Sequence, residues 1–302
     1  MNHTRTLTRR LRAASVALCV LALALASAPA AQHAATVARP SVDYGPPVDV
    51  VVQGAVDAEL QPLLAALTDK EQVQVAAWTF WRGTLGGKRV VVSRTEVGPM
   101  NASVATTLAI ERFRPRLIIN QGTAGALDPS LKVFDIVAGE ATVDYGAFRS
   151  SHADAGAGVS QSRWTPLSHW LRPDGRERVE FRRFPGDAAA VAAVLATPNP
   201  RGRVVKGVIG SAFEFNREID RLIWVNKTYG AVSEDMESAF CAGAAAGFGV
   251  RFVAVRMISD SEFHSPEVQW AAGEYCAAFV VDLVKRFTLQ PSKTGPSHGG
   301  TP

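Results

Sequence analysis

The sequence predicts an α/β protein that folds as a three-layer αβα single domain. Short apolar runs, typical of strands buried on both faces, alternate with segments whose apolar residues recur at helical spacing. About 240 residues lie between two polar end segments, which suits one α/β unit. A hydrophobic content of 47% with only 20% charged residues excludes a wholly disordered chain.

The elements follow from these patterns in order. Strands are expected at residues 48–52, 78–84, 89–93, 117–120, 136–138, 204–209 and 252–255. Gly86 and Gly87 lie between the second and third of these, which predicts a hairpin. Helices are expected at 60–67, 102–109, 188–195 and 236–246, and a closing helix from Pro266 with Ser265 as its N-cap.

The first 31 residues predict a secretory signal peptide. They contain four arginines and no acidic residue, then an apolar run at 16–26 and an A-x-A end. A retained membrane anchor is the alternative, but the run is shorter than the ~20 residues that a spanning helix needs. We expect cleavage after Ala30 or Ala31 and export to a bacterial periplasm, with the Sec and twin-arginine routes both open.

The net charge of +4 and the pI of about 9.1 would by themselves suggest a nucleic-acid or membrane partner. The four arginines of residues 1–31 account for the whole excess, and the remaining chain has equal numbers of basic and acidic residues. We therefore expect no nucleic-acid partner, and no membrane association after cleavage. Residues 32–46 read as a linker, 47–288 as the folded domain and 289–302 as a disordered tail.

The cysteines and histidines give no metal-binding pattern. Cys241 and Cys276 remain after signal cleavage, and they form either a disulfide or two buried free thiols. His152, His169 and His264 are scattered without ligand spacing. We expect neither a metal nor a cofactor.

Three carboxylates stand where α/β domains bind ligands, beyond the carboxyl ends of strands. Glu59 follows the first strand, Glu237 begins a helix and Asp260 ends a late strand. Each has a structural alternative, because acidic residues also favour first helical turns and turn caps. The segments 121–125 and 97–102 lie beside other strand ends, but neither has P-loop or dinucleotide-binding spacing.

Taken in order, the segments GAVDAE, VGPMNA, NQGTAGAL, LKVFDIV, GSAF, DMESA and RMISD resemble the nucleoside phosphorylase superfamily. Within it they look most like the 5′-methylthioadenosine/S-adenosylhomocysteine nucleosidases, over residues 48–287. The spacing of DMESA and RMISD is the specific part. The resemblance implies a central mixed twisted sheet, a homodimer, and an enzyme that hydrolyses the N-glycosidic bond of methylthioadenosine-like nucleosides and releases adenine.

The resemblance also assigns roles at the site. Asp260 matches the acid that protonates the purine leaving group at N7, and Ser259 would orient it. Glu237 matches the acceptor for the ribose hydroxyls, with Met236 against the sugar. Glu59 matches the general base that positions water.

The remaining matches concern substrate contacts. Phe213 matches the aromatic residue that stacks on the base, although a core phenylalanine is an equal alternative. Apolar Val56 and Val97 match the subsite for the 5′ substituent. The strand-end residues Thr123, Ala124 and Gly125 are expected to face the same pocket.

Two alternative functions stay open. A phosphorylase needs arginines at its phosphate site, whereas Asn120 and Gln121 end the strand here and Glu59 would repel phosphate; only Arg94 lies near enough in sequence to keep this reading. The second alternative is a periplasmic nucleoside-binding or storage protein without turnover. It ranks lower because all three carboxylates are present.

The chain departs from the family pattern at three places. Glu96 and Phe134 stand where the family usually has glycine, so a changed loop backbone and local charge are expected near Glu96. Residues 150–203 have no clear counterpart, and we expect them to reshape the 5′ side or the dimer surface.

Overall fold

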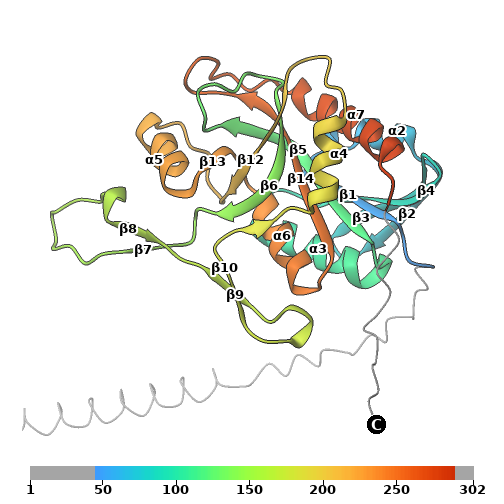
Figure 1. The fold of residues 1–302 in the computed structure, drawn as a ribbon, viewed down its shortest axis with the longest axis horizontal. Helices are drawn as coiled ribbons and strands as arrows, with labels where there is room; N and C mark the ends of the chain where they lie inside the picture. Colours follow the sequence, from blue (N-terminus) through green and yellow to red (C-terminus); the bar gives the residue numbers. More distant parts are fainter. Residues whose placement is uncertain (1–44, 290–302) are drawn as a thin grey trace, which may run out of the picture. The chain divides into compact units, whose positions relative to one another are not determined.

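The computed structural model describes residues 45–289, which form a mixed α/β domain (Figure 1). The strands are β1 (Val50–Gly54), β2 (Thr68–Val75), β3 (Trp78–Leu85), β4 (Lys88–Arg94), β5 (Leu117–Ala126), β6 (Ile136–Asp144), β7 (Phe148–Ser150), β8 (Trp164–Pro166), β9 (His169–Leu171), β10 (Val179–Phe181), β11 (Phe184–Pro185), β12 (Val204–Ser211), β13 (Ala231–Asp235) and β14 (Arg251–Asp260). The helices are α2 (Gln61–Ala66), α3 (Pro99–Phe113), α4 (Ala188–Ala196), α5 (Ile219–Tyr229), α6 (Ser238–Gly247) and α7 (Ala271–Arg286), with short 3₁₀ turns η1 (Asp57–Glu59), η2 (Gln161–Arg163) and η3 (Pro173–Gly175).

The expected signal peptide at 1–31 lies outside the described residues, as do most of the linker at 32–46 and the tail from 290 onward. No helix in the described part of the chain is both long and apolar enough to cross a bilayer.

Ten strands form one sheet in the order β11-β6-β12-β13-β5-β1-β4-β3-β2, with β14 paired to β5 and β6. Strand β1 is parallel to β4 and β5, whereas β2, β3 and β4 pair antiparallel, as the predicted hairpin requires. The pairings β5–β14–β6–β12–β13–β5 also close a ring. The sheet is therefore mixed, as the resemblance implied, and it is partly closed on itself.

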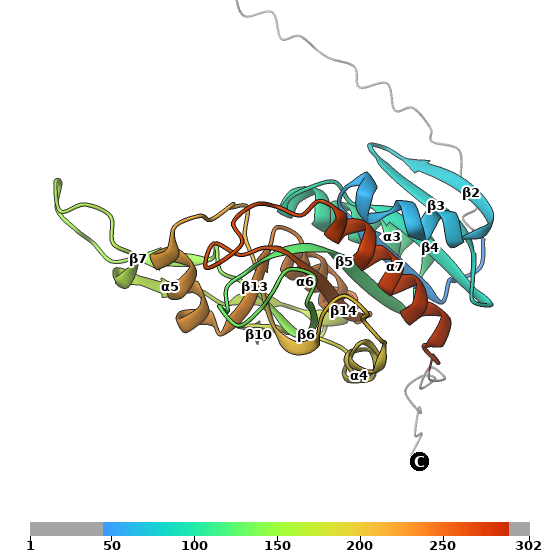
Figure 2. The same cartoon turned by 90° about the horizontal axis from the view of Figure 1, so that it is seen from above.

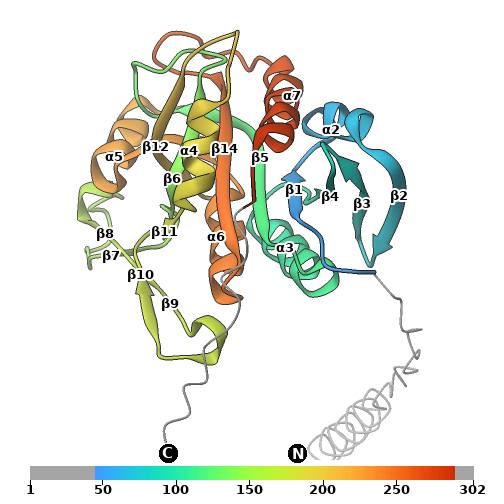
Figure 3. The ribbon, with the colours of Figure 1, turned by 45° about the vertical axis from the view of Figure 1, so that its right-hand side comes forward.

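Helices cover both faces of this sheet, which confirms the predicted layers. Alternate residues of a buried strand point to opposite faces, and here Val50 and Val52 join one core cluster while Val51 joins the other. Helices α2, α4 and α7 pack in the first cluster, and α3 and α6 in the second. Figures 2 and 3 show α7 and α3 on opposite sides of the central strands.

Strand β5 is longer than predicted, and this changes the setting of the segment 121–125. That segment does not form a loop after a strand; it continues β5, paired to β14 on one side and at its end to β13 on the other. Gly122 is needed for close approach rather than for a turn. A Cβ atom there would lie 2.4 Å from Arg256 Nη1 and 2.5 Å from Glu59 Oε1.

The closing helix begins later than predicted. Helix α7 starts at Ala271, and Ser265 is not its N-cap. The backbones of Ser261 and Ser265 instead exchange hydrogen bonds of 2.8 and 2.7 Å. Residues between this bridge and α7 form a loop that reaches the strand ends. Strands β2 and β13, the short strands β7 to β11 and helix α5 were not predicted from the sequence.

Two of the departures from the family pattern fall at strained backbone positions. Glu96 has φ 63° and Phe134 has φ 72°, in the left-handed region that glycine adopts at least cost. The backbone thus keeps the conformation that suits a family glycine, although the side chain differs. The local charge of Glu96 is neutralised by Arg94, whose Nε lies 2.8 Å from Glu96 Oε1.

Segments β7–β8 and β9–β10 form two hairpins that protrude from the sheet and its helices (Figure 1).

Cys241 and Cys276 are free and buried, which matches the alternative of two thiols. Burial raises the pKa of each to about 12, so neither is a reactive thiolate.

Candidate active site

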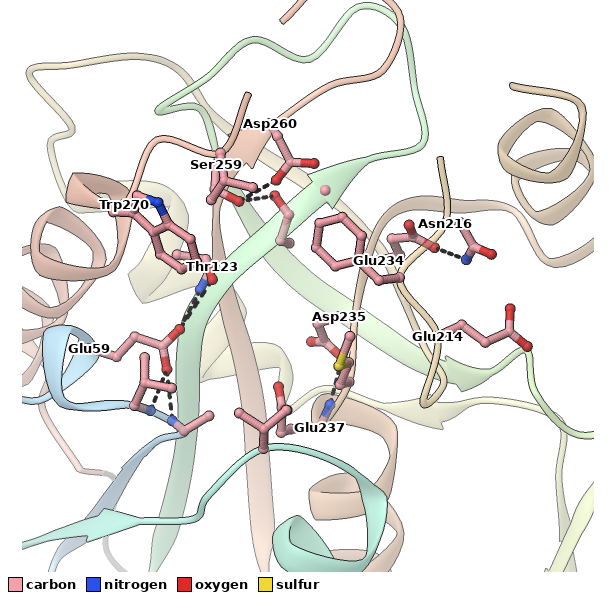
Figure 4. Close-up of a pocket in the computed structure, with 18 residues that line it drawn as sticks. Glu59, Thr123, Glu214, Asn216, Glu234, Asp235, Glu237, Ser259, Asp260 and Trp270 are labelled. Atoms are coloured by element: carbon pink, nitrogen blue, oxygen red, sulfur yellow. Dashed lines mark hydrogen bonds between the residues drawn. The ribbon is translucent and has the colours of Figure 1, made fainter. Parts of the chain in front are cut away.

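A cavity of about 300 Å³ opens where the ends of β5, β13 and β14 meet the segment after β1 (Figure 4). Its lining includes every predicted site residue except Phe213: Val56, Glu59, Val97, Thr123, Ala124, Gly125, Met236, Glu237, Ser259 and Asp260. The lining residues that sequence reasoning missed are Ala55, Glu214, Phe215, Asn216, Glu234, Asp235, Val268 and Trp270. The fold therefore brings together side chains that lie more than 200 positions apart in sequence.

Phe213 is the one predicted residue that does not line the cavity. Its side chain is 70% exposed and its ring lies beside Gly98, 2.8 Å from where a Cβ of that glycine would stand. Phe215, two positions later, lines the cavity instead. Both residues lie in the irregular stretch after β12, and the GSAF motif does not distinguish between them.

Glu59 is held by backbone amides on both carboxyl oxygens. The amide of Ala55 donates to Oε2 at 2.7 Å, and that of Thr123 donates to Oε1 at 2.9 Å. The side chain is only 4% exposed. Because one donor directly follows β1 and the other lies in β5, the carboxyl group is fixed in orientation at the edge of the cavity.

Glu237 is the N-cap residue of α6, but its side chain makes no capping hydrogen bond. Its Oε1 accepts a hydrogen bond of 2.9 Å from the amide of Gly98 in the VGPMNA segment, and its Oε2 lies 3.7 Å from Arg256 Nη2. Burial raises its pKa above the usual range, and Arg256 only partly offsets this. The structural alternative, an acid in the first helical turn, does not describe this side chain.

Beneath Glu237 lies a buried network that the sequence analysis did not identify. The Arg256 guanidinium donates to Asp235 Oδ2 and to Asn120 Oδ1, both at 2.5 Å. Asp235 Oδ1 in turn accepts from the amides of Glu237 and Ser238 at 3.0 Å. Burial by itself lowers the pKa of Arg256, but Asp235, Glu237 and Glu59 raise it. A buried cation thus sits among three carboxyl groups and holds the start of α6 in place.

Asp260 ends β14 and faces the cavity near Gly125, its register partner in β5. The Ser259 hydroxyl donates to Asp260 Oδ1 at 2.6 Å. Burial raises the pKa of Asp260 above its usual value, and the Ser259 hydrogen bond only partly offsets this. The group is therefore biased toward the protonated form that a general acid needs.

A second carboxyl group lies at the same end of the cavity. Glu234 Oε2 accepts from the Tyr145 hydroxyl at 2.8 Å and from Asn216 Nδ2 at 2.7 Å. Burial raises the pKa of Glu234 to about 7, and Asp260 and Glu214 add to the rise. The only sequence signal for this residue was its place directly before the DMESA segment.

The other walls are apolar, formed by Val56, Val97, Phe215, Val268 and Trp270. Trp270, on the loop before α7, is 77% exposed. No group of three or more histidine, cysteine, aspartate or glutamate side chains within residues 45–289 is arranged to hold a metal ion.

The structure also places the residues that bear on the open alternatives. Arg94 pairs with Asp57 at 2.7 Å and with Glu96 at 2.8 Å, and it does not line the cavity. No residue of 150–203 lines it either. Val159, Gln161 and Trp164 of that stretch line an adjoining hollow that also contains Phe215.

Comparison with known proteins agrees with this geometry. The sequence profile of the phosphorylase superfamily matches residues 49–287. The chain is 31% identical to a 5′-methylthioadenosine/S-adenosylhomocysteine nucleosidase of Staphylococcus haemolyticus, over 77% of this chain and 97% of that protein. It is equally similar, at 31%, to the nucleosidase of the same name from Shewanella loihica, over 77% of this chain and 96% of that protein.

A solved structure shows the same likeness. The 5′-methylthioadenosine/S-adenosylhomocysteine nucleosidase of Neisseria meningitidis, crystallised with methylthio-immucillin-A, superposes with a TM-score of 0.64 at 26% identity. The match covers 79% of this chain and 99% of that one. The resemblance seen in the motifs is thus confirmed, and the chain belongs to the phosphorylase superfamily.

Proposed function

We propose that the protein is a purine nucleosidase that hydrolyses the N-glycosidic bond of methylthioadenosine- or S-adenosylhomocysteine-like nucleosides and releases adenine. One observation carries the proposal: Glu59, Glu237 and Asp260, from three different strand ends, line a single cavity. The named activity of the relatives supports it.

Asp260 is the general acid in this proposal. A purine leaves poorly as an anion, so a proton delivered to N7 lowers the barrier to bond cleavage. Burial keeps the pKa of Asp260 raised, and the Ser259 hydroxyl fixes one carboxyl oxygen. The other oxygen is left to hold the proton that is donated.

Glu237 binds the ribose hydroxyls, with Met236 against the sugar. As the glycosidic bond breaks, positive charge develops on the sugar, and a carboxylate close to it stabilises that charge. The Gly98 amide and Arg256 fix the Glu237 side chain before substrate arrives. Substrate hydroxyls that donate to Glu237 would favour its ionised form.

Glu59 orients the attacking water. Each of its oxygens already accepts a backbone amide, and each keeps acceptor capacity for a water molecule. The rigid amide contacts hold the carboxyl group so that it can take a proton from water placed toward the anomeric carbon.

Water is favoured over phosphate as the nucleophile. Six lining residues carry carboxyl groups, namely Glu59, Glu214, Glu234, Asp235, Glu237 and Asp260, and no lysine or arginine of the described chain lines the cavity. A phosphate dianion would meet repulsion there without fixed donors. Arg94, which kept the phosphorylase alternative open, is paired with Asp57 and Glu96.

The apolar walls contact the base and the 5′ substituent of the substrate in this proposal. Phe215, rather than Phe213, stacks on the base in our proposal, because it lines the cavity. Val56, Val97 and Trp270 form the subsite for an apolar 5′ substituent. Thr123, Ala124 and Gly125 supply the floor on β5.

The test is a product assay on the purified mature protein. Methylthioadenosine in phosphate-free buffer should yield adenine and a free sugar. Adenine release only after phosphate is added would establish a phosphorylase instead. Tight nucleoside binding with no turnover over hours would establish a binding protein.

We also propose a homodimer that closes the 5′ side of the cavity. Large apolar side chains are exposed around its mouth: Val97 (41%), Met100 (73%), Phe213 (70%), Phe215 (62%) and Trp270 (77%). Monomers rarely expose clustered side chains of this kind. Sedimentation equilibrium should give twice the chain mass, and a fully active monomer would contradict the proposal.

Export is a further proposal, supported by the composition of residues 1–31. The periplasmic fraction of the native host should contain the protein, with a mature N-terminus after Ala30 or Ala31 by mass spectrometry. An intact N-terminus in the cytoplasmic fraction would overturn it.

A further inference from the structure

Glu234 and Asp260 lie on opposite sides of Gly125. Gly125 in β5 is the register partner of Glu234 in β13 and of Asp260 in β14. A Cβ on Gly125 would stand 3.3 Å from Asp260 Oδ2, 3.6 Å from Glu234 Cγ and 3.8 Å from Glu234 Oε1. The two carboxyl groups therefore converge over a residue that leaves its own side-chain space empty, which suits a flat ligand.

The hydrogen bonds of Glu234 leave one carboxyl oxygen free for a ligand. Tyr145 and Asn216 both donate to Oε2, and Asn216 Nδ2 also lies 2.9 Å from the Tyr145 hydroxyl. Within residues 45–289, no side chain or amide donates to Oε1. This network fixes the direction of the side chain, and the free oxygen belongs to a residue that lines the cavity.

We propose that Glu234 is a second base-reading residue, whose free carboxylate oxygen accepts a hydrogen bond from the exocyclic amino group of a 6-aminopurine while Asp260 serves N7. This inference rests on the proposed function and adds a specificity-determining residue to it.

The donor and acceptor pattern of the purine edge favours a 6-amino group over a 6-oxo group as the partner of Glu234. N7 accepts and the 6-amino group donates, so two carboxyl groups that share an adenine edge match it when one is protonated and the other is ionised. A 6-oxopurine substituted at N9 presents two acceptors, N7 and O6, and would need both carboxyl groups protonated. A pair of neighbouring carboxyl groups that hold a single proton therefore matches the 6-aminopurine.

The surroundings of Glu234 support a single proton on the pair. Tyr145, Asn216, Asp260 and Glu214 affect the pKa of Glu234 most after burial, and none of them is a cation. Arg221 lies over the Tyr145 ring and is paired with Glu214 at 2.8 Å. Burial raises the pKa of Glu234 to about 7, and Asp260 adds to this. Near neutral pH the ionised form of Glu234 is accessible, and a donating amino group stabilises it.

A structural role for Glu234 is the competing explanation, in which it only ties Tyr145 to the segment after β12. 9-Methyladenine and 9-methylhypoxanthine, called adenine and hypoxanthine in this test, separate the two roles. They share the ring system, keep N7 as an acceptor and differ at position 6. Calorimetry should give their Kd values for the wild type, for Glu234→Gln and for Glu140→Gln. Glu140 is a half-exposed carboxyl group on β6, paired with Lys206 and outside the cavity.

The wild type should bind adenine more tightly than hypoxanthine. Glu234→Gln keeps an acceptor for Tyr145 and Asn216 but turns an amide donor toward the base, so the preference should fall by about tenfold or more. Glu140→Gln should leave it unchanged. A preference within about twofold of the wild type in Glu234→Gln, or a wild type that binds hypoxanthine better or binds neither base, overturns the inference.

Two further measurements complete the test. If Glu234→Gln does not fold, the wild-type adenine preference should still increase from about pH 6 to about pH 8, as Glu234 ionises; a constant ratio contradicts the inference. Adenine release from methylthioadenosine is scored separately. A wild type that prefers adenine without cleaving nucleosides refutes the hydrolase alone, whereas cleavage with an unchanged preference in Glu234→Gln refutes the role of Glu234 alone.

Discussion

Glu237 Oε1 accepts a hydrogen bond of 2.9 Å from the amide of Gly98, a residue 139 positions earlier in the chain. Gly98 begins α3 with φ 96°, and Glu237 directly precedes α6. The contact therefore joins two helix starts across the cavity. Helices α3 and α6 pack in the same core cluster, so the Glu237 carboxyl group is positioned by the helical layer as well as by the sheet.

Asp260→Asn should abolish most turnover without disturbing the fold. Asparagine can still accept the Ser259 hydrogen bond, but it cannot give a proton to N7. We expect adenine release to slow by roughly 10²–10⁴-fold, measured as kcat with saturating methylthioadenosine. Thermal unfolding of the variant serves as the control and should match the wild type. Wild-type kcat in this variant would assign the acid elsewhere.

The pH profile of the reaction should report the protonation of Asp260. Asp260 must be protonated to act, so kcat/KM falls as the pH rises through its pKa. Because burial raises that pKa, the fall should begin at a higher pH than for an ordinary aspartate. The residual activity of Asp260→Asn should lack this descending limb. A profile that keeps rising with pH in the wild type would count against a carboxylic acid as proton donor.

The sequence predicted the layers and the three carboxylates for a physical reason. Buried strands and amphipathic helices carry strong periodicity, and acids at strand ends fall in the region where this fold binds ligands. Glu59, Glu237 and Asp260 could therefore be located from spacing and motif together. The structure places all three at one cavity.

Other features depend on contacts that no local pattern records. Strand β2 is mostly exposed and polar, so it shows no apolar alternation. The continuation of β5 past Asn120 depends on pairing with β14, which follows more than 100 residues later. Whether Phe213 or Phe215 lines the cavity depends on the backbone path of an irregular segment, which no periodicity predicts. In the sequence, nothing distinguishes Arg256 from an ordinary strand residue, because only the fold brings it to its buried acidic partners.

Glu59→Gln should lose catalysis while it keeps affinity for the base. One oxygen becomes an NH₂ group facing the Ala55 or Thr123 amide, so the side chain can no longer accept both hydrogen bonds or take a proton from water. We expect kcat to fall by about 10²–10⁴-fold and the Kd for adenine to change by no more than about threefold. Glu140→Gln is the matched control. Equal losses in both variants would show that charge alone, and not position, is responsible.

Phe215→Ala and Phe213→Ala should have different effects on base binding. Phe215 lines the cavity, whereas Phe213 packs beside Gly98. Loss of base stacking costs about 1–3 kcal/mol, so the Kd for adenine should rise by roughly 5- to 160-fold in Phe215→Ala. Phe213→Ala should change the Kd less. Calorimetry decides, and a larger effect at Phe213 would restore it as the stacking residue.

Gly122→Ala tests whether the stability of the fold depends on the close packing around Gly122. The added methyl group would stand 2.4 Å from Arg256 Nη1 and 2.5 Å from Glu59 Oε1, and Arg256 is 1% exposed and cannot move away freely. We expect the free energy of unfolding to fall by roughly 2–4 kcal/mol, with lost adenine release because Glu59 is displaced. Gly247→Ala is the matched control, because a Cβ there meets nothing within 4 Å and alanine favours the helix. Urea unfolding of both variants gives the comparison, and equal stabilities would mean that the buried guanidinium has room to shift.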